Sequence, residues 1–146
     1  MAHFAKLDSN NNVTRVLVVD DSNSGGGELA TENVGIGFLQ NMFGGDTNWK
    51  QTSYNRNLRG NYAGIGYTYA TNVATLGVGS TDVFLPQQPH ASWSVGVTTA
   101  SWYSPLGNPP TLTTAEVTAG KYYIWDEDAH QADTASPKTV GWAITT

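Results

Sequence analysis

The sequence predicts a mainly β, β-rich α+β protein, in which an antiparallel sheet or sandwich of hairpins carries one short helix. Only 13% of the 146 residues are charged and 16 are glycines, a balance typical of turn-rich β proteins. Short β-branched and aromatic runs alternate with clusters of Asn, Asp, Gly and Pro. Because this length matches a common domain size, we expect one β-rich domain over residues 1–146.

Residues 1–21 are expected to form an N-terminal hairpin. Residues 3–7 alternate polar and apolar side chains, residues 8–12 form a polar turn cluster, and residues 13–19 are rich in β-branched side chains. Both faces of the 13–19 strand are partly apolar, which predicts a central strand. The following segment, residues 20–27, contains three consecutive glycines and is expected to be a mobile surface loop.

One short helix is expected over residues 31–44. Thr31 is its predicted N-cap and Glu32 favours the first turn. Apolar residues then recur at helical spacing and two glycines end the helix: Ile36, Leu39 and Phe43, then Gly44 and Gly45. Gly35 and Gly37 each weaken it by about 1 kcal/mol relative to Ala.

Residues 48–146 are expected to form strands, long loops and two Trp-paired hairpins. The strands are predicted at residues 49–54, 63–69 and 83–85, the last one bounded by Pro86. One hairpin pairs the Trp93 and Trp102 segments, and the other pairs Trp125 with Trp142. Between these hairpins, residues 104–120 have no clear period and are predicted to be a long loop.

Composition excludes several classes of function. The net charge is −5, and the seven basic residues are scattered from Lys6 to Lys138, which argues against a nucleic-acid partner. The chain has no Cys, so disulfides and thiolate chemistry are excluded. The longest apolar run, residues 16–19, is too short to span a membrane, and no signal peptide is recognised at the N-terminus.

No residue pattern predicts catalysis, a cofactor or a metal site. The three histidines, at positions 3, 90 and 130, lack metal-ligand spacing, and no Gly-x-Ser-x-Gly elbow occurs. Residues 8–12 resemble the opening of a calcium loop, but Val13 and Val19 occupy the positions that need Gly and Glu, so a hairpin turn is favoured. Residues 126–128 are either a solvated acidic turn, which we favour, or ligands for a divalent ion. We therefore predict that the protein is not an enzyme.

The aromatic residues are the most informative class. The chain has 5 Trp and 7 Tyr, which either pack in the core and across strands, as we favour, or form a flat exposed platform for sugar. His90 and His130 are expected in loops, and His3 beside the first strand. The candidates for a sugar platform are Gln88, His90, Trp93, Trp102 and Tyr103.

Six segments carry a resemblance to a known family: MAHFAKLD at residues 1–8, VTRV at 13–16, TNWKQTSYN at 47–55, NYAGIGYTY at 61–69, PHASW at 89–93 and YIWDE at 123–127. The chain resembles a family of small, mostly uncharacterised proteins from tailed phages of cyanobacteria and other marine bacteria. The resemblance covers nearly the whole chain. The sequence departs from the usual pattern of that family at residues 70–81 and 128–137. It implies a phage origin and a component of the virion, but it brings no catalytic motif.

The resemblance and the composition together predict an accessory structural protein of the virion. We expect a capsid decoration or cement subunit, present as a homo-oligomer that contacts other virion proteins. Apolar residues in the 104–120 loop are the candidate partner interface: Leu106, Pro109, Pro110, Leu112 and Val117. The alternative is a tail-associated adhesion module that binds cell-surface glycan through the aromatic platform.

Overall fold

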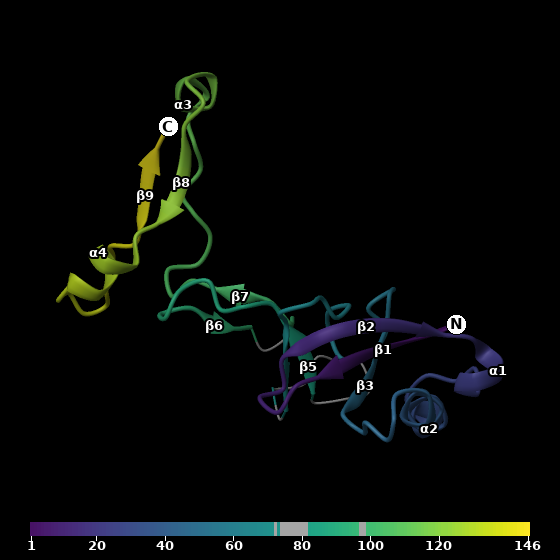
Figure 1. Ribbon diagram of the computed structural model, residues 1–146. Helices are drawn as coiled ribbons and strands as arrows, with labels where there is room; N and C mark the ends of the chain where they lie inside the picture. Colours follow the sequence, from purple (N-terminus) through teal and green to yellow (C-terminus); the bar gives the residue numbers. More distant parts are fainter. Residues whose placement is uncertain (72, 74–81, 97–98) are drawn as a thin grey trace. The chain divides into compact units, whose positions relative to one another are not determined.

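A computed structural model describes residues 1–71, 73, 82–96 and 99–146 (Figure 1). It consists of small antiparallel sheets with short helices, which confirms the β-rich fold class. Residue contacts divide the chain into an N-terminal unit, Met1–Gln87 with Val95–Ser101, and a C-terminal unit, Gln88–Ser94 with Trp102–Thr146. Each unit is described by itself, and the single domain expected over residues 1–146 stays a prediction. The departure from the family pattern at residues 70–81 lies largely outside the described residues.

A three-stranded sheet organises the N-terminal unit. β1 (Ala2–Leu7) and β2 (Val13–Val19) form the expected hairpin, and β3 (Trp49–Thr52) pairs with the other edge of β1 (Figure 1). The strand order is β2-β1-β3, so β1 is central and β2 is an edge strand. The prediction of a central strand at residues 13–19 was therefore wrong. Its apolar residues have another cause, because both faces of this sheet are covered.

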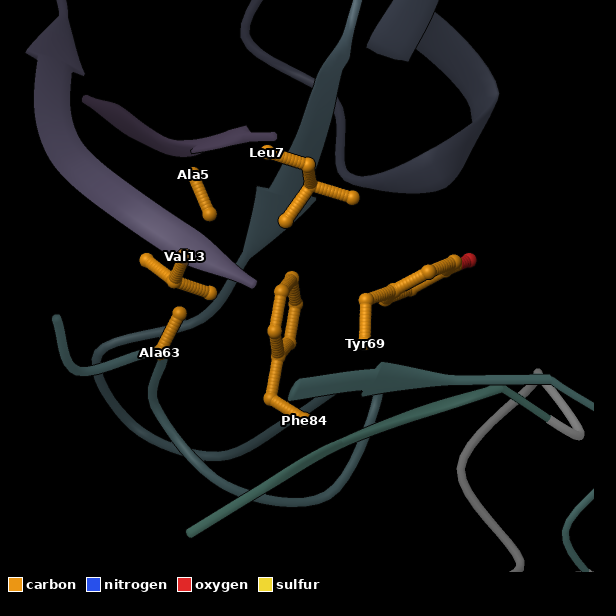
Figure 2. Packing of buried hydrophobic residues seen from close by; sticks show 6 residues of the cluster. All are labelled: Ala5, Leu7, Val13, Ala63, Tyr69 and Phe84. Carbon is orange, nitrogen blue, oxygen red and sulfur yellow. The ribbon is translucent and has the colours of Figure 1, made fainter. Parts of the chain in front are cut away.

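Alternate residues of β1 contribute to two core clusters on opposite faces of the sheet. On one face, residues of β1, β2 and β3 pack with Leu39 of α2 (Glu32–Met42): Ala2, Phe4, Val19 and Trp49. On the other face, residues of the hairpin pack against β4 (Thr68–Ala70) and β5 (Val83–Leu85). Figure 2 shows this second cluster, with the Phe84 ring among the side chains of Ala5, Leu7, Val13, Ala63 and Tyr69. Both clusters bury their apolar side chains within this one unit.

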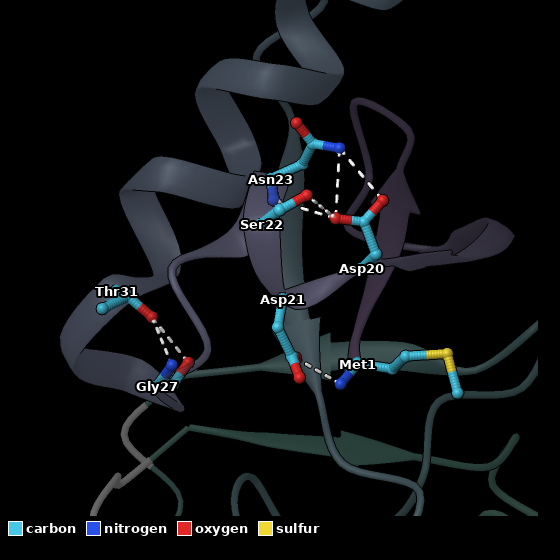
Figure 3. A network of polar contacts seen from close by, with 7 residues as sticks. All are labelled: Met1, Asp20, Asp21, Ser22, Asn23, Gly27 and Thr31. Atoms are coloured by element: carbon cyan, nitrogen blue, oxygen red, sulfur yellow. Dashed lines mark hydrogen bonds and ion pairs between the residues drawn. The ribbon is translucent and has the colours of Figure 1, made fainter.

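Helix α2 confirms the helix expected over residues 31–44, but its start differs in detail. Thr31 occupies the N-cap position without capping the helix through its side chain. Its hydroxyl instead donates to the Gly27 carbonyl at 2.6 Å and accepts from the Gly27 N–H at 3.0 Å (Figure 3). Glu32 lies in the first turn of α2, and its carboxylate binds the buried Arg59 guanidinium and accepts a hydrogen bond from the Gln51 N–H. This ion pair ties the start of α2 to the loop after β3.

Part of the glycine-rich segment at residues 20–27 is helical, whereas composition predicted a loop throughout. It forms the short helix α1 (Asp21–Ser24), whose N-cap Asp20 accepts a hydrogen bond from the Asn23 N–H (Figure 3). Ser24 is buried, and a 3-10 helix, η1 (Leu29–Thr31), leads into α2. The left-handed conformation at Gly25 ends α1, so a glycine in this segment serves a defined turn.

The three strands predicted between residues 49 and 85 are all present, with different lengths. The predicted strand at residues 49–54 ends at Thr52 in β3, and β5 matches residues 83–85. The strand expected at residues 63–69 is reduced to β4, because the Tyr67 N–H donates to the Gly64 carbonyl and closes a turn there. Alternating side chains at residues 65–69 therefore did not reflect a continuous strand.

The C-terminal unit contains short strands and two further helices. β7 (Trp102–Tyr103) pairs with β6 (Ser94–Val95), in which the boundary between the two units falls. β8 (Tyr122–Trp125) pairs with β9 (Trp142–Thr145), and Trp125 lies directly opposite Trp142. The Trp125–Trp142 hairpin is thus confirmed. The segments of Trp93 and Trp102 do pair, but Trp93 lies one residue before β6, and a cross-strand Trp93–Trp102 pair stays a prediction.

The prediction of only one helix was wrong. Helix α3 (Thr114–Thr118) lies in the segment expected to be a structureless loop, and a capping box between Thr113 and Glu116 starts it. Helix α4 (Glu127–Ala132) lies in the connection from β8 to β9, and Asp126 caps it. In the part of the chain that the structure describes, no helix is long and apolar enough to cross a membrane.

Candidate interaction site in the C-terminal unit

The C-terminal unit leaves many of its large apolar side chains exposed. Among the described residues, Trp125, at 7% exposure, is its only buried apolar side chain, whereas every other one lies in the N-terminal unit. Six of its large apolar side chains are exposed: Tyr103, Val117, Tyr122, Ile124, Val140 and Ile144. A segment of this size with so small a core is marginally stable by itself. This imbalance marks the unit as a candidate interaction site.

Three of these six exposed residues, Tyr122, Ile124 and Ile144, lie in the β8–β9 hairpin. Directly paired residues share a face, so Tyr122 and Ile124 lie on one face with Thr145 and Ala143. The other face carries Trp125, Trp142, Tyr123 and Ile144. Tyr122 is 51% exposed and Ile124 is 46% exposed, so the first face is open to solvent.

Three indole rings pack together on the second face. Ring centroids of Trp125 and Trp142 are 5.3 Å apart, and Trp93 lies 5.9 Å from Trp125 and 6.0 Å from Trp142, all edge to face. The ring centroid of His130 lies 4.9 Å from that of Trp125. This buried histidine belongs to α4 and not to the loop that was predicted for it. Edge-to-face pairs of this kind add about 0.5–1.5 kcal/mol each beyond the area that they bury.

The carboxylate of Glu127 joins α4 to the segment that carries Trp93. It accepts hydrogen bonds from the Ser92 hydroxyl and the Trp125 indole, each at 2.7 Å, from the Ser92 N–H at 3.0 Å and from Gln131 at 2.8 Å. The bonds from Gln131, Ser92 and Trp125 lower the pKa of Glu127 to about 2. Asp126 caps α4 and Asp128 is exposed, so residues 126–128 begin a helix and are not the free acidic turn that we favoured.

The predicted partner interface is only partly assembled in one place. Leu106 and Pro110 line an open groove of about 390 Å³ together with Trp142, Asn108, Lys138 and Thr139. Trp142 is held there because its indole N–H donates to the Gly107 carbonyl at 3.2 Å. Pro109 is exposed beside the groove, Leu112 is half-buried, and Val117 is exposed on α3. The role of these five residues in binding stays a prediction.

Three residues of the predicted sugar platform lie together. Gln88 donates to the carbonyl of Trp93 at 2.9 Å, and the His90 ring lies 5.5 Å from the Trp93 ring, so these three residues are neighbours. Trp93 is engaged with the other two indoles of the cluster. Trp102 and the exposed Tyr103 lie in β7. The platform as a whole stays a prediction.

Several residues that build this unit were missed from the sequence. Glu127 and Ser92 bind each other across 35 positions, and no local pattern connects them. Gly141 is required for a different reason: a Cβ there would lie 2.3 Å from Cη2 of Trp125. By contrast, the capping box at Thr113 and Glu116 was a readable signal for α3.

In the described residues, no group of three or more His, Asp or Glu side chains is placed to hold a metal ion. The turn at residues 8–12 instead uses Asp8 internally, since its carboxylate accepts from the N–H groups of Asn10 and Asn12. This confirms the hairpin-turn interpretation of that segment.

No family model, curated protein or solved structure matches the chain.

Proposed function

We propose that this protein is an accessory structural subunit of a tailed-phage particle, a capsid decoration or cement subunit that binds other virion proteins through its C-terminal unit. The supporting observation is that this unit exposes six large apolar side chains and buries one. The connection with phages comes from the resemblance of the six sequence segments. Neither a catalytic role nor a cofactor is proposed.

The mechanism is burial of the open face of the β8–β9 hairpin. Each Ile or Tyr that passes from half-exposed to buried removes apolar surface from water, and a fully buried Ile contributes about 1.5–3 kcal/mol. Because the protein, as a decoration subunit, binds the assembled shell and not the separate shell subunits, binding stabilises the assembled state by mass action. Repetition over a symmetric shell multiplies this effect.

The alternative, a tail-associated adhesion module that binds sugar, requires two aromatic faces exposed together. Trp93, the central residue of that platform, packs against Trp125 and Trp142. No observation in the described residues favours the alternative over assembly, so it is not proposed as a second function.

Mass spectrometry and imaging of purified particles test the proposal. We expect many copies of the chain on the head. Absence of the chain from the particle, or a few copies at the tail tip only, would overturn the decoration role.

A matched pair of variants tests the binding surface. Ile124 and Ile65 are both exposed isoleucines, but Ile124 lies in β8 and Ile65 in the N-terminal unit. Ile124→Ser should weaken binding to particles that lack the protein by about three- to tenfold, as expected for losing the burial of the 46% of Ile124 that is exposed. Ile65→Ser should bind like the wild type. Equal binding by both variants would place the contact elsewhere.

A further inference from the structure

The outer edge of β8 is an open hydrogen-bonding edge. The Asp126 N–H donates to the Gly141 carbonyl at 2.7 Å, and this pair continues the register that places Trp125 opposite Trp142. Hydrogen-bonded and non-hydrogen-bonded pairs alternate along an antiparallel ladder. The backbone groups of Tyr122 and Ile124 therefore face β9, and those of Tyr123 and Trp125 face away from it. In the described part of the chain no other strand pairs with this side of β8.

This edge lacks the features that protect strand edges. Edge strands in monomeric proteins commonly carry charged residues, proline or a bulge that prevents pairing with another chain. β8 is Tyr-Tyr-Ile-Trp, without charge, glycine or proline, and its register with β9 is regular. A two-stranded sheet is also marginally stable by itself, and three or more strands with an apolar face are needed for independent stability.

The charges at the two ends of β8 have opposite signs. Lys121 is exposed directly before the strand, and Asp126, Glu127 and the exposed Asp128 follow it. When two copies of β8 pair antiparallel, Lys121 of each copy comes beside the acidic start of α4 in the other. A parallel pairing would bring like charges together at both ends.

We infer that β8 pairs antiparallel with β8 of a second copy of this chain and so forms a continuous four-stranded sheet of order β9-β8-β8-β9. This inference rests on the proposed function, since it names the first partner of the same unit. Across the two copies, the residues whose backbone groups face away from β9, Tyr123 and Trp125, pair with each other. In such an antiparallel pairing Tyr122 and Ile124 of both copies lie on one face of the joined sheet. The dimer thereby doubles the apolar surface that the unit presents to the particle.

A proline substitution tests the edge itself. Tyr123→Pro removes an N–H that faces away from β9, so the β8–β9 ladder keeps its hydrogen bonds while strand addition is blocked. Tyr123→Ala is the matched control, because it loses the same ring but keeps the N–H. Sedimentation equilibrium of the full chain should show a dimer for the wild type and for Tyr123→Ala, and a monomer for Tyr123→Pro. A wild-type monomer, or a Tyr123→Pro dimer of wild-type affinity, would overturn the inference.

A charge exchange provides a test that does not alter the backbone. Lys121→Asp and Asp128→Lys should each weaken the dimer by about two- to fivefold for each ion pair lost, and the effect should fade at high salt. The double variant should regain part of the lost affinity, since Lys at position 128 then faces Asp at position 121 while Asp126 and Glu127 are unchanged. If it stays as weak as the single variants, the two charges do not face each other and the antiparallel pairing is wrong. The particle-binding test is separate, because a monomer that binds particles would leave the proposed function standing without the dimer.

Discussion

The β1–β2 and β8–β9 hairpins are made of similar strands but are covered very differently. Both carry apolar residues on both faces. In the N-terminal unit α2 covers one face and β4 with β5 the other, so that Phe4 and Ala5 are both 0% exposed. In the C-terminal unit the indole cluster covers one face, while Ile124 on the other face stays 46% exposed.

The two hairpins show that a local apolar pattern in a strand does not by itself determine whether the strand is buried. An apolar strand pairs because of its own sequence, but its faces become a core only when other segments cover them. The N-terminal unit brings its covering segments from positions 32–42 and 68–85. In the C-terminal unit Trp93, α4 and the segment around Gly107 contact the second face of the β8–β9 hairpin. The first face, with Tyr122 and Ile124, is the one to which we assign a partner.

Truncating the indole cluster should give the largest effect. Trp125→Ala removes the only buried apolar side chain among the described residues of the C-terminal unit and should cost about 3–5 kcal/mol of its unfolding free energy. Hydrogen exchange should then rise over residues 102–146, while the protection of residues 2–19 stays as in the wild type. Unchanged exchange at β8 and β9 would mean that this indole does not stabilise the hairpin.

Two glycines of α2 should respond oppositely to the same substitution. A Cβ at Gly35 would lie 2.2 Å from Cζ of the buried Phe4, so Gly35→Ala must displace the helix or the ring and should cost about 1–3 kcal/mol. Gly37 has nothing within 4 Å of such a Cβ, and Gly37→Ala should stabilise the protein by up to about 1 kcal/mol. Denaturant unfolding of both variants measures the difference. Equal shifts would show that α2 does not pack as closely on β1 as described.

Gly141 is the counterpart of Gly35 in the C-terminal unit. Gly141→Ala places a Cβ 2.3 Å from the Trp125 ring and should also cost about 1–3 kcal/mol. Near-ultraviolet circular dichroism should lose part of the indole signal. Gly120→Ala makes no such contact and should leave that signal intact, although its positive φ of 68° adds local strain. A full indole signal in Gly141→Ala would contradict the packing of Trp125 on this glycine.

Acid should loosen the C-terminal unit at Glu127, with the smallest effect of the four. Because its pKa is lowered to about 2 from 4.5, its contribution to stability is present above pH 4.5 and is lost as the pH falls toward 2. Tryptophan fluorescence should therefore change between pH 4.5 and 2. Glu127→Gln should reduce that change, since it removes the titrating group. A titration identical in this variant and the wild type would assign the acid response to another carboxylate.

The sequence by itself determined the elements whose signals are local. The hairpin over residues 1–21 follows from alternation on both sides of an Asn-rich turn, where Asn11 adopts the left-handed conformation that asparagine tolerates. The helix at residues 31–44 follows from apolar spacing and two terminal glycines. The pairing of Trp125 with Trp142 was likewise readable, because aromatic residues favour directly opposed positions.

The candidate site was predictable only in part. Leu106 and Pro110 were proposed from an apolar, proline-rich segment, and they line one groove with Trp142. The open edge of β8 was not foreseen, because an exposed edge depends on which strands fail to pair with it. The connection of Ser92 to Glu127 was equally hidden, since it spans 35 positions.

Only the tertiary structure decided which apolar faces are covered. Residues 13–19 look central because both their faces are apolar, yet β2 is an edge strand whose buried ends, Val13 and Val19, belong to two separate core clusters. Gly35 and Gly37 are equivalent in the sequence, and the Phe4 ring alone makes one of them indispensable. A local pattern fixes which residues can be buried, but burial itself depends on contacts between segments far apart in the chain.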